Sequence, residues 1–96
     1  MKTHFNEDFL EKSTETLRAV AHPIRLVIID MLSKRESLTV TEIYEQLQIE
    51  QAVVSHHLRK MKDKNIVKVQ REGKNSLYSL TSNAYQEIVS ILITVV

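Results

Sequence analysis

Hydrophobic and polar positions follow two different patterns along this chain. Helical patterns, with apolar residues three and four apart or apolar almost all round, run through residues 7–20, 24–32, 42–47, 50–61 and 83–96. Residues 66–71 are β-branched and roughly alternating, and residues 76–80 return after a turn. The sequence therefore predicts a mainly α fold with a small β-hairpin before the last helix (α+β).

The segment after His22-Pro23 is apolar on nearly every side. Proline is tolerated at a first helical position, and a helix that is apolar all round is buried. We therefore expect this helix to be the hub of the core, and His22 to be structural rather than a ligand. Arg25 and Asp30 are its polar exceptions, and its apolar residues are Ile24, Leu26, Val27, Ile28, Ile29, Met31 and Leu32.

The middle of the chain predicts two short helices with a tight connection. Residues 33–37 are a polar turn, residues 38–40 a short extended piece, and Thr41 is the expected N-cap of the helix over 42–47. Residues 48–50 turn the chain into the next helix. Two helices joined in this way form the helix-turn-helix pattern.

The second of these helices, Glu50 to Met61, has two unlike faces. Val54, Leu58 and Met61 form an apolar stripe with His57 at its edge, and no acid lies between Glu50 and Asp63. Hydrogen-bonding and cationic side chains of this kind suit a helix in the DNA major groove. On this helix alone, an ordinary amphipathic helix with a basic solvent face is equally compatible. The opposite face consists of Gln51, Ala52, Ser55, His56, Arg59 and Lys62.

The predicted hairpin turns at residues 72–75 and contains the only glycine, Gly73, where a positive φ is expected. Arg71, Lys74 and Asn75 lie at its tip. Cationic tips reach phosphates or the minor groove, although a solvated hairpin tip is common. Directly after a helix-turn-helix, the first interpretation, a DNA-contacting wing, is favoured.

Both ends of the chain carry apolar surface that needs a cover. Asn6 or Asp8 is expected to cap the first helix, and Thr81 or Ser82 the last, whose β-branched end could instead be a strand. A large apolar terminus on a monomer favours aggregation, and pairing of the two end helices across a two-fold axis would cover it. Folding back on the chain's own core is the alternative for the first helix. The predicted dimer residues are Phe5, Phe9, Leu10, Ile88, Ile91, Leu92 and Val95.

Composition places the chain among small globular proteins with an uneven charge. Its 96 residues predict one domain, residues 1–96, and carry a net charge of +1. Residues 50–80 hold seven basic against three acidic residues, which is a local footprint for a polyanion. The absence of cysteine excludes disulfides and thiolate metal sites. Neither a signal peptide nor a membrane span is expected, so the cytoplasm is the predicted location.

The sequence closely resembles the ArsR-type winged helix-turn-helix repressors, the arsenic- and metal-responsive family of bacteria. The matching segments are LRAVAHPIRL (residues 17–26), QAVVSHHL (51–58), VKVQREGK (67–74) and YSL (78–80), within a similarity that covers residues 14–96. The resemblance implies a homodimer that blocks transcription at an operator until an effector weakens binding. It also implies base reading by Gln51, Ser55 and His56, a phosphate contact by Arg59 and a wing contact by Lys74. Glu50 is a departure, because the family often has a small polar cap there.

The metal sites of the family are not matched. Thr39 and Thr41 stand where the arsenic and cadmium sensors carry cysteines, and threonine is not a ligand for soft metals. The last helix, where zinc and nickel sensors have Asp and His pairs, contains no histidine and one acid, Glu87. We therefore expect no metal and no cofactor, with a site built from His4 across a dimer as the remaining possibility. The signal would be a small molecule between subunits, a partner protein or protein concentration.

Two other functions compete with a dimeric repressor bound to an operator in double-stranded DNA. A winged-helix module could dock a protein through its apolar ends instead of binding DNA. An enzyme is disfavoured, because the chain has no glycine-rich phosphate loop and no nucleophile–base pair with an orienting acid. DNA binding is favoured because the basic helix and the basic hairpin follow one another.

Overall fold

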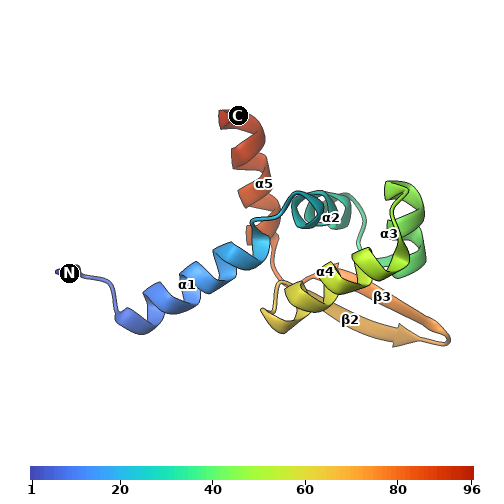
Figure 1. The fold of residues 1–96 in the computed structure, drawn as a ribbon, viewed down its shortest axis with the longest axis horizontal. Coiled ribbons are helices and arrows are strands. Elements are labelled where there is room, and N and C mark those ends of the chain that lie inside the picture. Colours follow the sequence, from blue (N-terminus) through green and yellow to red (C-terminus); the bar gives the residue numbers. More distant parts are fainter.

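The computed structural model describes residues 1–96 and contains five helices and a three-stranded antiparallel sheet (Figure 1). The mainly α class with a β-hairpin is therefore confirmed, with one additional short strand. The elements in chain order are α1 (Glu7–Val20), α2 (Pro23–Lys34), β1 (Leu38–Thr39), α3 (Val40–Leu47), α4 (Gln51–Asp63), β2 (Val67–Glu72), β3 (Asn75–Leu80) and α5 (Asn83–Val95).

The core is built around α2, as its apolar pattern predicts. Ile28 and Ile29 of α2 are fully buried, and side chains from every other element except β3 and α5 join them. The two exceptions pack partly buried residues, such as Tyr78 and Ile88, against this core. Its other buried apolar members are Ala19, Val20, Leu32, Leu38, Ile43, Val54, Leu58, Met61, Ile66 and Val67.

Side-chain caps fix where α1, α2 and α5 begin. The Asn6 carboxamide accepts the Asp8 N–H at 2.7 Å, which makes Asn6 and not Asp8 the cap of α1. Ser82 Oγ accepts the Ala84 N–H at 3.1 Å and begins α5, which is helical to Val95 rather than a strand at its end. His22 caps α2, because its Nδ1 accepts the Ile24 N–H at 3.1 Å. This contact satisfies an N–H that would otherwise have no partner in the first turn.

Two predicted boundaries around α3 are wrong. The predicted turn over 33–37 begins too early, since α2 continues through Lys34. The N-cap of α3 is Thr39 and not Thr41: Thr39 Oγ1 accepts the Glu42 N–H at 3.1 Å, while the Thr39 N–H donates to the Glu42 carboxylate at 3.0 Å. This reciprocal pair is a capping box. The hydrogen bond from the Thr39 backbone holds the pKa of Glu42 below its ordinary value.

The strands form a sheet in the order β1-β3-β2. The hairpin register pairs Glu72 with Asn75, so that Gly73 and Lys74 alone form the turn and Asn75 belongs to the strand. Gly73 has φ +64° and Lys74 does not have a positive φ, which is the pattern of a type II′ turn. The extended piece at Leu38 pairs with Tyr78 of β3, a long-range contact that the sequence did not predict.

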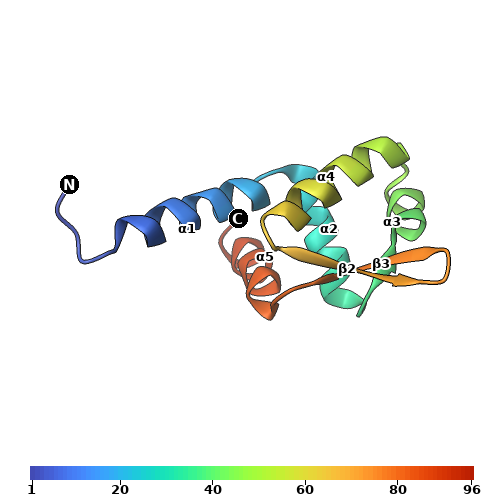
Figure 2. The same cartoon turned by 90° about the horizontal axis from the view of Figure 1, so that it is seen from below.

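The molecule is elongated because α1 leaves the body. The fold extends over 50 × 29 × 22 Å, with a radius of gyration of 14.5 Å, against about 12.5 Å for a compact domain of this length. The N-terminal end of α1 projects to one side in both Figure 1 and Figure 2, and the hairpin tip lies at the opposite end. The first half of α1 therefore has no part of its own chain to pack on.

None of the helices combines the length and the apolar character that crossing a membrane requires.

Replacing the true cap of α3 should be more costly than replacing the expected one. Thr39→Ala removes the side-chain acceptor of the capping box and should lower the free energy of unfolding by about 1 kcal/mol. Thr41→Ala, the matched control on the exposed first turn of α3, should change it by less than about 0.5 kcal/mol. Urea denaturation of both variants at one protein concentration measures the difference, and equal effects would contradict the assignment of Thr39.

Candidate nucleic-acid interface

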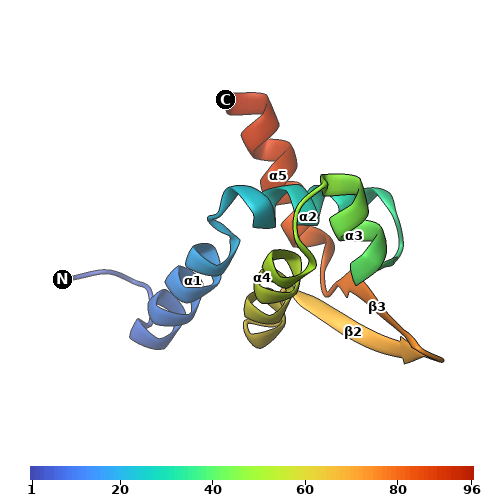
Figure 3. The same ribbon diagram turned by 45° about the vertical axis from the view of Figure 1, so that its right-hand side comes forward.

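Helix α4 is held by the stripe that the sequence predicted. Val54, Leu58 and Met61 are fully buried, and α4 lies against α2, α3 and β2. Gln48, in the left-handed conformation with φ +55°, ends α3 and turns the chain into α4. The helix-turn-helix therefore forms from α3 and α4, with the hairpin beside α4 (Figure 3).

The predicted DNA-contacting residues of α4 lie on its accessible side. Gln51, Ala52, His56, Arg59 and Lys62 are exposed, and Ser55 is half-buried. No hydrogen bond within the chain engages the side chains of Gln51, Ser55 or His56. These groups are therefore free to contact an outside partner.

The tip of the hairpin adds a second accessible cationic element. Arg71, Lys74 and Asn75 are all exposed. The tip and the N-terminal end of α4 lie toward the same end of the molecule (Figures 1 and 2). One elongated partner could therefore meet both.

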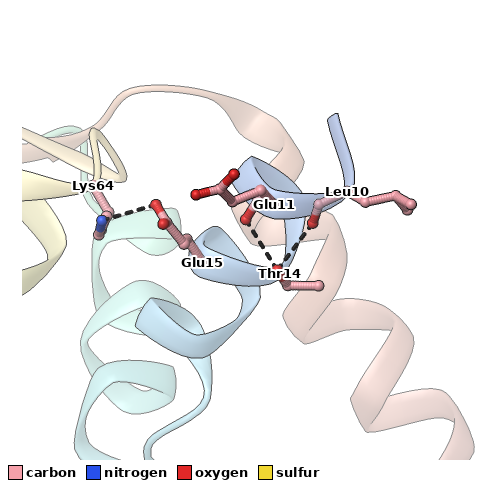
Figure 4. A network of polar contacts seen from close by, with 5 residues as sticks. All are labelled: Leu10, Glu11, Thr14, Glu15 and Lys64. Atoms are coloured by element: carbon pink, nitrogen blue, oxygen red, sulfur yellow. Dashed lines mark hydrogen bonds and ion pairs between the residues drawn. The ribbon is translucent and has the colours of Figure 1, made fainter. Parts of the chain in front are cut away.

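The positive charge on this side is not neutralised within the chain. Each of the four ion pairs in the structure lies outside the predicted interface residues. One of these pairs joins Lys64, directly after α4, to Glu15 of α1 at 3.1 Å (Figure 4). No acid of the chain forms an ion pair with the cations of the predicted interface, which therefore remain available to a polyanion. These cations are Arg59, Lys62, Arg71 and Lys74.

Glu50 is the one acid at the start of this surface. It occupies the N-cap position of α4 but makes no side-chain capping hydrogen bond, although its backbone carbonyl accepts the Val53 N–H at 3.1 Å. A carboxylate here suits the positive end of the helix dipole. It would repel a phosphate placed at the same point.

The sequence assigned His57 to the edge of the apolar stripe, but the structure buries it. Its side chain is 6% exposed, and its Nδ1 accepts a hydrogen bond from Arg25 Nε at 3.0 Å. Burial lowers the pKa of His57 below its ordinary value, and the neighbouring His22, Arg25 and His56 lower it further. Arg25 stands out in the sequence as a cation on an otherwise apolar helix, but its partner 32 positions away could not be read from it.

The apolar surfaces of α1 and α5 remain open in the single chain. Phe5 and Phe9 are about half exposed and stack with ring centroids 5.2 Å apart, while Leu10 is half-buried. On α5, Ile88 is half-buried, while Ile91 (61%), Leu92 (37%) and Val95 (71%) are exposed. Leu26, Val89, Leu92, Ile93 and Val96 line an apolar groove between α2 and α5.

The resemblance places Thr39 and Thr41 at positions where metal sensors carry cysteines. The Thr39 hydroxyl is occupied in the capping box, and Thr41 is exposed on the next turn. No group of three histidine, aspartate or glutamate side chains is arranged to hold a metal ion.

Comparison with known proteins agrees with this geometry. The sequence profile of the bacterial regulatory proteins of the arsR family matches residues 22–69. The transcriptional repressor PagR of Bacillus anthracis is 39% identical over 83 residues, which cover 86% of this chain and 83% of PagR. The transcriptional regulator YgaV of Escherichia coli is 31% identical over 82 residues, covering 85% of this chain and 83% of YgaV.

Solved structures share the fold. The crystal structure of PagR superposes with a TM-score of 0.82 at 37% identity and covers 91% of this chain and 99% of PagR. The homodimeric winged helix-turn-helix DNA-binding domain of Mb0332 from Mycobacterium bovis has a TM-score of 0.82 at 21% identity, covering 99% and 89% of the two chains. With its helix-turn-helix, basic hairpin and family profile, this chain belongs to the arsR family of bacterial regulatory proteins and is a winged helix-turn-helix transcriptional regulator.

Proposed function

We propose that this protein is a homodimeric repressor that places α4 in the major groove of an operator and the hairpin tip on the adjacent backbone or minor groove. The observation that carries the proposal is the row of exposed cationic and hydrogen-bonding side chains on α4, none of them engaged by an acid of the same chain. Residues 1–96 would act as one DNA-binding domain.

The side chains divide into two kinds of contact. Gln51, Ser55 and His56, with Ala52 leaving room between them, would read base edges through hydrogen bonds. The longer cations of α4, Arg59 and Lys62, would hold phosphates and fix the register of the helix. Arg71, Lys74 and Asn75 would anchor the wing. Glu50, at the start of α4, would keep phosphates away from that end of the helix.

Dimerisation would double this contact. The open apolar surfaces of α1 and α5 suit pairing with a second copy through Phe5, Phe9, Leu10, Ile88, Ile91, Leu92 and Val95. The relative from Mycobacterium bovis is a homodimer, which supports the same arrangement here. Two copies of α4 related by a two-fold axis would bind half-sites about 34–36 Å apart.

The effector of this regulator would differ from a soft metal, because threonines replace the cysteine ligands. A small molecule between the subunits, a partner protein or protein concentration would supply the signal. The regulator would act in the cytoplasm, where bacterial DNA is, and it would need no catalytic step. Docking of a protein in place of DNA is the weaker alternative, because it leaves the unpaired cations of α4 and the hairpin unexplained.

Base reading is tested on α4 itself. Ser55→Ala combined with His56→Ala should reduce binding of a duplex enriched from a random pool to the level of a scrambled duplex, because two base-edge contacts are lost. The variant should remain dimeric. Gel shift and sedimentation measure both properties, with Gln86→Ala on the exposed side of α5 as control. Wild-type discrimination by the double variant would overturn the assignment.

The wing is tested by the dependence of binding on salt. Each phosphate contact contributes close to one unit to the slope of log affinity against log salt concentration. Lys74→Ala should therefore lower the magnitude of this slope by about one per protomer. Lys34→Ala, which removes a lysine paired with Asp30 beside the start of α5, should leave the slope unchanged. Equal slopes for Lys74→Ala and the wild type would exclude a wing contact.

The dimer surface is tested on α5. Ile91→Asp should raise the dimer dissociation constant by more than about a hundredfold, since an uncompensated buried charge costs about 3–5 kcal/mol. Gln86→Asp introduces the same charge on the same helix and should leave the dimer intact. Sedimentation equilibrium compares the two variants, and a dimeric Ile91→Asp protein would place the interface elsewhere.

A further inference from the structure

The interior contact between Arg25 and His57 joins three helices that the proposed function uses. Arg25 of α2 donates from Nε to His57 Nδ1 of α4 at 3.0 Å, and from Nη1 to the backbone carbonyl of Ala19 in α1 at 3.1 Å. Helix α1 is the proposed dimer helix, and α4 is the proposed base-reading helix. One guanidinium therefore connects the two surfaces.

The Ala19 carbonyl needs a donor from outside its helix. The residue four positions later is Pro23, which has no N–H to donate. Arg25 supplies the missing hydrogen bond at the place where the chain turns from α1 into α2. The planar fork of an arginine can hold two acceptors at a fixed angle, which a lysine cannot do. The contact thus fixes the direction of the last turn of α1 relative to α4.

We propose that Arg25 is a positioning residue that aligns the base-reading helix α4 with the dimer helix α1, and that neutral His57 is the acceptor on which this alignment depends. The inference rests on the proposed use of α4 in DNA binding. In a two-fold dimer, a small rotation of α4 relative to α1 in both subunits changes the spacing of the two base-reading helices. Loss of the contact would therefore weaken operator binding without breaking the dimer.

The chemistry of His57 makes this alignment sensitive to acid. A protonated histidine carries a proton on both ring nitrogens, so Nδ1 can no longer accept from Arg25. The positive ring would then lie beside the Arg25 guanidinium and the His22 ring, whose centroid is 4.2 Å away, with the His56 ring at 5.1 Å. The hollow that Arg25 lines is also lined by charged side chains of α1 and α4. They are Glu15, Arg18, Lys60, Asp63 and, directly after α4, Lys64, of which Glu15 and Lys64 pair with one another. No carboxylate lies within ion-pair distance of His57 to compensate.

The direction in which stability changes with pH follows from the lowered pKa of His57. Because the folded protein holds a proton on His57 less readily than the unfolded chain, the stability from this group is complete above the ordinary pKa of about 6.5 and decreases as the pH falls below it. A loss of operator affinity in acid is therefore expected from protonation of His57.

The test compares His57→Asn with Arg25→Lys in the full chain. The Asn Oδ1 occupies the place of the imidazole Nδ1, accepts from Arg25 and does not titrate. The probe is a duplex that the wild type enriches from a random pool, measured from about pH 7.5 down to the lowest pH at which the protein stays folded, because the pKa of His57 lies below the ordinary histidine value. We expect the wild type to lose about tenfold in affinity in acid, the equivalent of one buried hydrogen bond to a charged group. His57→Asn should bind like the wild type at the higher pH and show no acid loss.

Arg25→Lys should bind about tenfold more weakly at the higher pH while remaining a dimer. Arg18→Lys is the matched control, because Arg18 lines the same hollow and its side chain makes no hydrogen bond or ion pair. Wild-type binding by Arg25→Lys, or an unchanged acid loss in His57→Asn, would overturn the proposal.

Hydrogen exchange without DNA separates this inference from the proposed function. After correction for intrinsic rates, acid should speed exchange of the amides in α4 and at the α1–α2 connection of the wild type, and not in His57→Asn. If this difference is found but the wild type binds no duplex, the alignment stands and the proposed function falls. If the two proteins exchange alike, the proposal for Arg25 and His57 is wrong whatever the DNA binding.

Discussion

The structure depends on the burial of the apolar stripe of α4 against α2, α3 and β2. Val54, Leu58 and Met61 are fully buried, and a side chain of this size contributes about 1.5–3 kcal/mol when it leaves water. This burial fixes the rotation of α4 about its axis. Because the stripe faces the core, Gln51, His56 and Arg59 must face outward. The orientation of the proposed DNA-contacting face is thus a consequence of hydrophobic packing on the opposite side.

The placement of charged residues gives the proposed DNA-contacting face a positive local field. The chain as a whole has a net charge of only +1, so long-range attraction by total charge is weak. The acids are used elsewhere: Glu42 closes the cap of α3, and Glu15 and Asp30 pair with Lys64 and Lys34. The cations of α4 and of the hairpin have no such partners. The local field therefore arises from the excess of bases over acids within residues 50–80, while most acids of the chain lie outside this segment.

The elements that could be predicted are those whose signals are local. The stripe of α4, the apolar α2 and the positive φ at Gly73 are each readable from neighbouring residues. The cap of α3 was also readable, because Thr39 and Glu42 have the spacing of a capping box, but two nearby threonines allowed the wrong choice. Two contacts could not be read from the sequence, because each joins residues more than thirty positions apart. They are the pairing of Leu38 with Tyr78 and the burial of His57 against Arg25.

The same distinction applies to the candidate interface. The helical periodicity and the charge pattern of the sequence placed the predicted DNA-contacting residues on one side of α4 and at the hairpin tip. In the fold all of them are exposed except Ser55, which is half-buried. The link between the positions of α4 and α1 could not be read from the sequence. Arg25 makes this link through the backbone carbonyl of Ala19 and a ring nitrogen of His57. The open faces of α1 and α5 are visible as apolar sequence, but their geometry in a dimer depends on a second chain.

The most direct measurement is a map of backbone amide chemical shifts when a duplex enriched by the protein is added. The account predicts the largest changes at Ala52, Ser55 and His56 and at the hairpin tip around Lys74, with little change along α5. Changes confined to α1 and α5, with α4 unaffected, would contradict the claim that α4 carries the contact with DNA.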